Sequence, residues 1–478
     1  MLESEKSDLP GDSQLTEDWD HDPENPRNYS LQRRICTTIA VTLLAFVTTF
    51  AASIYSPAID AVGAEFDLSE EVSILPLSLY NLGLAAGPLV GSPMSETLGR
   101  KPVILITSPI FALFILGAGF SQNLTLLCTC RFFAGVFAAP AVSNASATIT
   151  DFTSGAYRGI SMSFYYSVPT FGAALGPLVG GFVVQSKGWR WTQWTTIFFI
   201  VAFYLPVLAT RETYKKKILQ RRAKRMGVEG SLKTERSIFQ AVGYFATTLL
   251  LRPVHMLLTE PIVSLVCLYN GFMFGLMYTY VVASAWIYQH YYGFSSTAQT
   301  LSFLGLVTGT LLAPCVLIPL DHFLYQPRLK AFRANNPANE PFPPEHRLYP
   351  AMIASFLLPA SLFAFAWTTR PTIHWICPLI FQSLTMLFNL MIYAPANLFM
   401  MDAYGPLYGA SAAGAAMLSR YALSCAFPLF SLTMYKALGV GWATSVLGFA
   451  TLLMAPIPWV FWCKGEALRK RTRYETSF

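Results

Sequence analysis

The chain has 478 residues, of which 54% are hydrophobic and only 12% are charged, and its formal net charge is +7. A soluble domain has about a quarter of its residues charged, so this composition excludes an ordinary soluble protein. Apolar runs of about 20 residues, long enough to cross roughly 30 Å of hydrocarbon as helices, recur along the chain, and they lack the alternation that a β-barrel requires.

The apolar runs predict twelve transmembrane helices in two six-helix halves, and therefore an all-α membrane protein. The largest polar interruption separates the sixth run from the seventh. We expect an N-terminal segment over 1–34, halves over 35–210 and 262–463, a linker over 211–261 and a tail over 464–478. The predicted spans are 35–57, 72–94, 102–121, 125–150, 158–185, 190–210, 262–289, 297–321, 348–368, 372–400, 407–433 and 438–463.

The distribution of basic residues predicts the orientation. Of the 33 Lys and Arg residues, 27 fall on the side that holds both termini, 4 fall on the other side and 2 lie inside spans. Because basic loops stay on the cytoplasmic side during insertion, both termini are expected in the cytoplasm. This asymmetry accounts for the net charge, so the charge gives no reason to expect a nucleic-acid partner. The stretch Lys215–Arg225 in the linker is typical of a basic helix lying on the anionic inner leaflet.

Acidic residues recur at matching helix ends in the two halves. Asp151 ends the fourth span and Asp402 ends the tenth, 251 residues later. Glu96 and Asp321 end the second and eighth spans, and a longer loop after the eighth span restores the same offset. This repetition is typical of transporters built from two related halves, which bind substrate near the midplane between them.

The stretch "GSPMSETLGRKPV" places charged residues in a tight turn between the second and third spans. Gly99 allows a sharp reversal, and Arg100 and Lys101 are expected to anchor the turn on the cytoplasmic side. Glu96 can pair with a cation or face the N-terminus of another helix, a contact that could form in one conformation and break in another.

The stretch "GAALGPLVGG" in the fifth span combines small residues with a proline. Glycines four residues apart let two helices approach closely and slide, and Pro177 removes one backbone hydrogen bond. A close-packed helix pair without movement is the alternative interpretation. The glycines concerned are Gly172, Gly176, Gly180 and Gly181.

These motifs resemble a known family. "SETLGRKP" resembles the signature loop of the major facilitator superfamily, with Glu96 where the family usually has Asp. "LCTCRFFAGVFAAP" is similar to the family's arginine motif, with Arg131 and Gly135 in place and Ala134 where Gln is common. "GAALGPLVGG" matches its antiporter pattern, and "DPENPRNYS", "WRWTQW" and "DAYG" resemble the fungal twelve-span drug:proton antiporter branch. The resemblance implies alternating access, usually driven by proton antiport, in pumps for drugs, metabolites or organic acids.

The charged residues inside the spans indicate the charge of the transported substrate. Arg131 and Arg420 lie near mid-helix in the fourth and eleventh spans, and no Asp or Glu lies in the middle of a span. A charge in the membrane is costly and usually functional, and a guanidinium binds a carboxylate bidentately. We therefore expect export of a small organic acid or acidic metabolite. A multidrug antiporter for neutral or cationic compounds is the alternative, in which Arg131 pairs with backbone carbonyls and Tyr421 or Ser419 satisfies Arg420.

Polar and aromatic residues on the spans that line the family's cavity are further candidates for substrate contacts. Asn389 and Tyr393 are four residues apart and share a helix face. Gln382 follows Arg131 by 251 residues and is expected opposite it. Each could instead make an interhelical contact. The whole set is Tyr55, Asn144, Asn270, Tyr278, Gln382, Asn389 and Tyr393.

Other functional classes find no support in the sequence. The histidines are scattered, no HExxH or phosphate-binding GxxxxGK[ST] pattern occurs, and the eight cysteines match no metal spacing. We therefore expect no enzyme, no catalytic or metal site and no cofactor. The other membrane classes are a channel and a sensor that no longer transports. The expected protein is a monomer that binds a small molecule and protons, in the plasma membrane.

Overall fold

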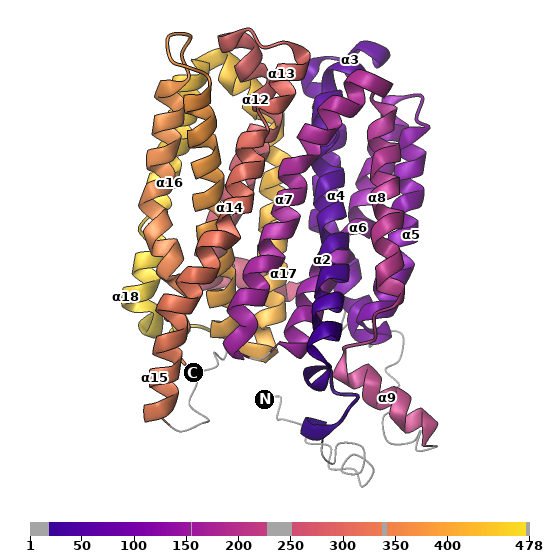
Figure 1. Cartoon of the computed structure of the whole chain (residues 1–478), viewed down its shortest axis with the longest axis vertical. Helices are drawn as coiled ribbons and strands as arrows, with labels where there is room; N and C mark the ends of the chain where they lie inside the picture. The colour runs from indigo at the N-terminus through magenta and orange to yellow at the C-terminus, as the bar shows by residue number, and fades with distance from the viewer. Residues whose placement is uncertain (1–18, 154, 227–250, 337–341, 475–478) are drawn as a thin grey trace.

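The computed structural model describes residues 19–153, 155–226, 251–336 and 342–474, and its regular elements in these ranges are all helical. The long helices run side by side along one axis (Figure 1). Helices α3 and α13 lie at one end of the bundle and α9 and α15 at the other, and we call these the α3 end and the α9 end. The indigo-to-magenta helices α2 to α8 form one side of the view, and the orange-to-yellow helices form the other.

The first half contains six crossings, and turn-forming residues set their ends. Gly99 has a φ of 102°, a conformation that glycine adopts without strain, and it separates α4 from α5. Pro57 lies in a 3-10 turn after α2, so the first crossing ends at Ser53, earlier than predicted. The elements are η1 Trp19–His21, η2 Pro26–Asn28, α2 Leu31–Ser53, η3 Ser56–Ala58, α3 Ile59–Phe66, α4 Glu70–Leu98, α5 Arg100–Gly119, α6 Leu124–Phe152, α7 Gly155–Lys187 and α8 Arg190–Leu208.

The second half continues the pattern after α9 (Lys215–Arg225) and α11 (Arg252–Thr259). The long helix α17 is broken at Gly405 and Gly439, which have φ values of 59° and 72°. Its three pieces supply the tenth crossing, the eleventh and, together with α18, the twelfth. The elements are α12 Pro261–Tyr292, α13 Ser296–Leu301, α14 Leu304–Leu320, the π-helix η6 Asp321–Tyr325, α15 Gln326–Asn335, η7 Pro344–Leu348, α16 Tyr349–Thr368, α17 Ile376–Met454 and α18 Ile457–Arg469.

The crossings account for the predicted number of spans. In the described part of the chain, ten helical segments are long and apolar enough to cross a membrane. The segment Tyr408–Arg469 contains two crossings separated by Gly439, and α4 adds one more. The prediction of a twelve-helix, all-α membrane protein is thereby confirmed.

Helix α9 differs from the expected lipid-facing helix. Its apolar residues Ile218, Leu219 and Ala223 are buried inside the protein, so they are not available to enter a bilayer. Arg222 binds Asp22 and Glu24 of the N-terminal segment, with a 3.1 Å distance to Glu24. Burial lowers the pKa of Arg222, but hydrogen bonds from its guanidinium to these carboxylates and their negative charge outweigh burial and raise that pKa. The helix is therefore fastened to the N-terminal segment.

Candidate functional site

An ion cluster joins the two halves at the α9 end, and we call Arg158, Asp321, Arg347 and Asp402 the inter-half ion cluster. Asp402 on α17 accepts from Arg158 of α7 at 3.1 Å and from Arg347 of η7 at 3.0 Å. Arg347 also lies 3.5 Å from Asp321. The side chain of Arg347 is only 4% exposed, so its charge depends on both carboxylates. Arg158 is the member that comes from the first half.

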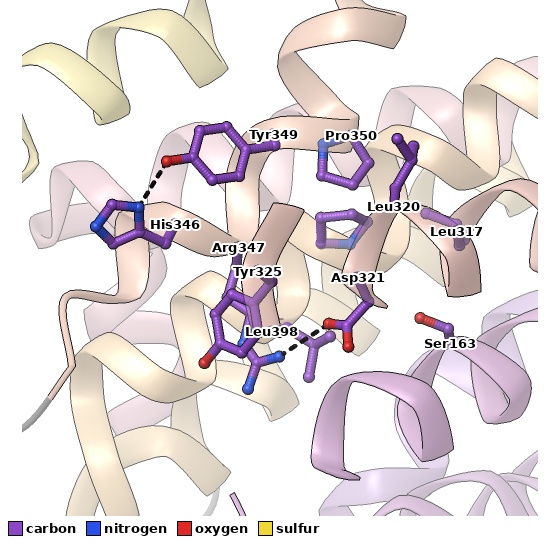
Figure 2. Close-up of a pocket in the computed structure, with 11 residues that line it drawn as sticks. Ser163, Leu317, Leu320, Asp321, Tyr325, His346, Arg347, Tyr349, Pro350 and Leu398 are labelled. Atoms are coloured by element: carbon purple, nitrogen blue, oxygen red, sulfur yellow. Dashed lines mark hydrogen bonds and ion pairs between the residues drawn. The ribbon is translucent and has the colours of Figure 1, made fainter. Parts of the chain in front are cut away.

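A pocket lies beside this cluster, where α7 faces the second half (Figure 2). Ser163 of α7 lines one side, and Asp321, Arg347 and Tyr325 line another. The Arg347 guanidinium lies 3.9 Å from the centre of the Tyr325 ring, a cation–π contact that helps to hold it in place. The pocket is therefore built from both halves, and any separation of α7 from η7 would open it.

The first half has a related ion pair that stays within that half. Arg100 of α5 lies 3.7 Å from Asp151 of α6, and Thr213 donates a hydrogen bond to Asp151 at 3.0 Å. This pair matches Arg347 and Asp402 in position. The offset of 251 residues that relates the two aspartates takes Arg158 to Gly409, which has no side chain to reach across. The two halves are therefore joined asymmetrically.

Glu212 holds the turn that contains Arg100 and Lys101. Its carboxylate accepts hydrogen bonds from the backbone N–H groups of Arg100 at 2.9 Å and Lys101 at 3.2 Å, and from those of Thr213 and Tyr214 at 3.0 Å each. The carboxylate therefore caps the first turn of α5, where unpaired N–H groups and the helix dipole favour a negative charge. Sequence reasoning did not identify Glu212. The side chain of Glu96 lies outside the described part of the structure.

Hydrogen bonds close the bundle at the α3 end. Ser56 donates to the carbonyl oxygen of Val281 at 2.6 Å, and Gln185 donates to that of Ser296 at 2.6 Å. Lys436 pairs with Glu70 across the halves. A Cβ atom on Gly181 would collide with Thr300, so the halves touch directly there. The two halves are therefore in contact at both the α3 end and the α9 end.

Arg131 is fully engaged by backbone carbonyls. Its Nη1, Nη2 and Nε atoms donate to the carbonyl oxygens of Ala51 at 2.8 Å, Ala52 at 3.2 Å and Pro76 at 3.3 Å. The side chain is completely buried, and its guanidinium lies 4.5 Å from the centre of the Tyr80 ring. Ala51 and Ala52 are in the last turn of α2, where free carbonyls attract a cation. In this conformation Arg131 joins three helices, and each of its three nitrogens donates to a backbone carbonyl oxygen.

Arg420 is surrounded by aromatic rings, whereas the guanidinium of Arg131 donates to backbone carbonyl oxygens. It is 7% exposed, and its guanidinium lies 4.5 Å from the centre of the Tyr421 ring and 4.7 Å from that of Phe274. Nη1 donates to the Tyr393 hydroxyl oxygen, whereas Nε has no hydrogen-bond partner among the residues that the structure describes. Among the described residues no carboxylate lies within 4.0 Å of its nitrogens. The Ser419 hydroxyl, which was the other expected partner, donates to the Cys267 carbonyl oxygen at 3.1 Å.

The other predicted substrate contacts fall into two groups. Three are hydrogen-bonded inside one half: Tyr55 donates to Ser73, Gln382 to Ser284, and Asn389 to Met273. Gln382 thus binds α12, the first helix of the second half. Arg131 likewise binds α2, the first transmembrane helix of the first half. In contrast, both amide atoms of Asn270 and the Nδ2 atom of Asn144 are buried with no hydrogen-bond partner in the described part of the chain. Tyr278 is fully buried and lies within electrostatic reach of both arginines.

The predicted glycines mark a close helix pair. A Cβ atom on Gly172 would lie 2.5 Å from the Phe46 carbonyl oxygen, and Cβ atoms on Gly176 and Gly180 would overlap the end of α2 in the same way. These three glycines pack α7 against α2 inside the first half, whereas Gly181 faces the second half. Pro177 lies inside α7, as predicted from the sequence.

Comparisons with known proteins agree with this architecture. The chain is 36% identical to the citrinin biosynthesis cluster MFS transporter mrr1 of Monascus ruber, with 96% of this chain and 92% of that protein covered. It is 31% identical to the efflux pump radE of Floropilus chiversii (96% and 86% covered) and 32% identical to polyamine transporter 4 of Saccharomyces cerevisiae (96% and 73% covered).

A solved structure of the proton:xylose symporter XylE has the same fold, with a TM-score of 0.66, 16% identity and 91% of this chain and 97% of that chain covered. The family model described as Major Facilitator Superfamily matches residues 41–428. This match and the full-length relatives confirm the resemblance drawn from the signature loop. They also show that the protein is a transporter and not an enzyme. The chain belongs to the Major Facilitator Superfamily.

Proposed function

We propose that the chain exports a small organic acid or acidic metabolite, with Arg420 as its anion contact. The observation that supports this proposal most directly is a buried guanidinium without a carboxylate partner. Removing such a charge from water costs several kcal/mol, and the surrounding rings offset only part of that cost. A carboxylate on the substrate would supply the missing charge and bind through two parallel hydrogen bonds.

The names of relatives are consistent with export of a metabolite. One relative is called an efflux pump, and another belongs to a citrinin biosynthesis cluster. The name of a third relative, polyamine transporter 4, favours a cationic cargo instead. A polyamine requires carboxylates in its site, and the residues described around Arg420 include none. The arginine therefore favours an anion.

Alternating access would require the inter-half ion cluster to break. We place the α9 end in the cytoplasm, because the basic loops gather there, and we place the protein in the plasma membrane as a proton-coupled monomer. Opening of the α9 end would separate Arg158 from Asp402, whereas opening of the α3 end would separate Ser56 from Val281. Substrate bound at Arg420 lies between these two sets of contacts.

Export of a neutral, drug-like compound is the second candidate. Asn144 and Asn270 favour it, because their unpartnered amide atoms could bind uncharged polar groups. In this case Arg420 would stabilise the bundle through its contacts with Tyr393 and the neighbouring rings, and Asn270 would be the more important contact.

The test is efflux from yeast that express the chain, loaded either with di- and tricarboxylic acids or with a neutral azole drug. Arg420→Gln is expected to reduce acid efflux at least tenfold and to leave protein levels unchanged. Arg370→Gln is the matched control, because Arg370 lies in an exposed loop at the α3 end. Azole efflux that survives Arg420→Gln, together with no acid efflux by the unmodified chain, would refute the proposal.

A further inference from the structure

Aromatic rings surround Arg420 on several sides. Phe274 comes from α12, and Tyr393 and Tyr421 come from the tenth and eleventh crossings in α17. The rings also contact one another, with 5.0 Å between the centres of Phe274 and Tyr393 and 6.3 Å between those of Phe274 and Tyr421. Both pairs have the T-shaped arrangement that aromatic rings prefer. The anion contact is therefore embedded in an aromatic wall.

The free edge of the guanidinium determines where a carboxylate can bind. Nη1 is occupied by the Tyr393 hydroxyl oxygen, so a bidentate carboxylate would use the edge formed by Nε and Nη2. The group attached to that carboxylate would then lie within a few ångströms of the rings. A flat, conjugated group would gain most there, since it can present its edge or its face to them.

One further ring in this wall comes from the first half. Tyr166 of α7 lies with its ring centre 5.1 Å from that of Tyr393 and at an angle of 74°. Tyr166 is 8% exposed, and its hydroxyl contacts the sulfur of Met401 at 3.8 Å. When the halves separate, this ring contact opens and exposes one side of Tyr393.

From this arrangement we infer that the transported acid has a conjugated ring next to its carboxylate, and that this ring packs against Phe274 and replaces Tyr166 against Tyr393. The inference rests on the proposed function, because it requires the carboxylate to bind Arg420. It adds that an aromatic acid is preferred to a saturated acid of the same size and charge. When no substrate is bound, the Tyr166 ring packs against Tyr393 in the place that the substrate ring would take.

The test uses the purified full-length chain in nanodiscs and tritiated 2-naphthoate as the bound probe. Competitors are unlabelled 2-naphthoate, its saturated analogue decahydro-2-naphthoate and the neutral 2-naphthamide. We expect the saturated acid to bind about five- to tenfold more weakly than the aromatic acid, the range expected for losing one or two ring contacts. Phe274→Leu keeps an apolar side chain but removes the ring, and it is expected to bring this ratio close to one.

Phe272→Leu is the matched control, because Phe272 is on the same helix but contacts Phe427 instead of the rings at Arg420. Tyr421→Leu serves as a second ring variant if Phe274→Leu is not monodisperse in detergent. Equal binding of the two acids, with both weakened by Arg420→Gln, would refute the ring preference and leave the proposed function intact. Equal binding of 2-naphthoate and 2-naphthamide, insensitive to Arg420→Gln, would refute the proposed function. Failure of both acids to bind the unmodified chain would overturn both.

Discussion

Arg158 and Asp402 form a 3.1 Å ion pair between the two halves, although 244 residues separate them in the sequence. The same carboxylate binds Arg347 of its own half at 3.0 Å. Asp402 therefore serves both as a structural partner inside the second half and as the point to which the first half is attached at the α9 end.

Asp402→Asn is expected to favour conformations that are open at the α9 end. Arg158 loses its charged partner, whereas Arg347 keeps Asp321. A partly exposed pair such as Arg158–Asp402 is worth about 1 kcal/mol, which shifts a two-state equilibrium about fivefold. The measurement is maleimide labelling of Ser163→Cys in the pocket of Figure 2, in a chain whose eight cysteines have been replaced. The labelling rate should rise severalfold.

Asp151→Asn is the matched control for this experiment. It removes the corresponding carboxylate of the first half, which pairs with Arg100 and makes no ion pair across the halves in the described structure. Labelling of Ser163→Cys should stay close to that of the parent chain. Equal increases in both variants would show that the ion pairs act through helix stability instead of through the contact between the halves.

Arg131 and Arg420 are expected to differ in the effect of replacement. Arg131→Leu removes the side-chain donors of the Ala51 and Ala52 carbonyl oxygens in the last turn of α2, at about 1–3 kcal/mol each, and the link to Pro76 of α4. The apparent melting temperature in detergent should fall by roughly 10 °C. Arg420→Leu removes one hydrogen bond from Tyr393 and should shift the melting temperature far less. Similar losses for both variants would contradict the assignment of Arg131 as the structural arginine.

Sequence alone was sufficient for the fold because the signals for it are long and repeated. Apolar runs predicted all twelve crossings, and glycine or proline lies at most of the breaks between them. The exact ends of the helices were harder to predict from the sequence. The first helix stops at Ser53 because of the turn at Pro57, and the last crossing is divided between α17 and α18 near Pro456. Such local breaks depend on packing as well as on residue type.

The site was less predictable, because a sequence does not show which polar atoms are already satisfied. Arg131 and Arg420 look alike in an apolar span, and only their neighbours distinguish the guanidinium bound to three carbonyl oxygens from the one with a free Nε atom. Arg347 was missed as a partner of Asp402. Its position could have been found, since Arg100 precedes Asp151 by a similar number of residues. No pattern in the sequence indicated that the Tyr166 ring contacts Tyr393.

Gly176→Ala is expected to destabilise the first half. Its Cβ atom would overlap Ser53 and lie 2.8 Å from the Ile54 nitrogen, so α7 would have to move away from α2. Overpacking of this kind costs about 1–3 kcal/mol. Gly414→Ala is the control, because its Cβ atom would meet Pro253 at an ordinary 3.5 Å. Thermal unfolding in detergent measures both, and an unchanged melting temperature for Gly176→Ala would show that α7 is not closely held against α2.

Glu212→Ala is expected to loosen the turn between α4 and α5. The N–H groups of Arg100 and Lys101 would lose their charged acceptor, at about 2 kcal/mol, and a local opening would become roughly thirtyfold more frequent. Tryptic cleavage after Arg100 reports this opening, because cleavage follows the population of the open turn when closing is fast. Glu212→Gln keeps one acceptor oxygen and should give an intermediate rate. Glu466→Ala is the control, since Glu466 is exposed and pairs with the exposed Lys470. If Glu212→Ala is cleaved no faster than the parent chain, water replaces the carboxylate at little cost, and Glu212 does not determine the shape of the turn.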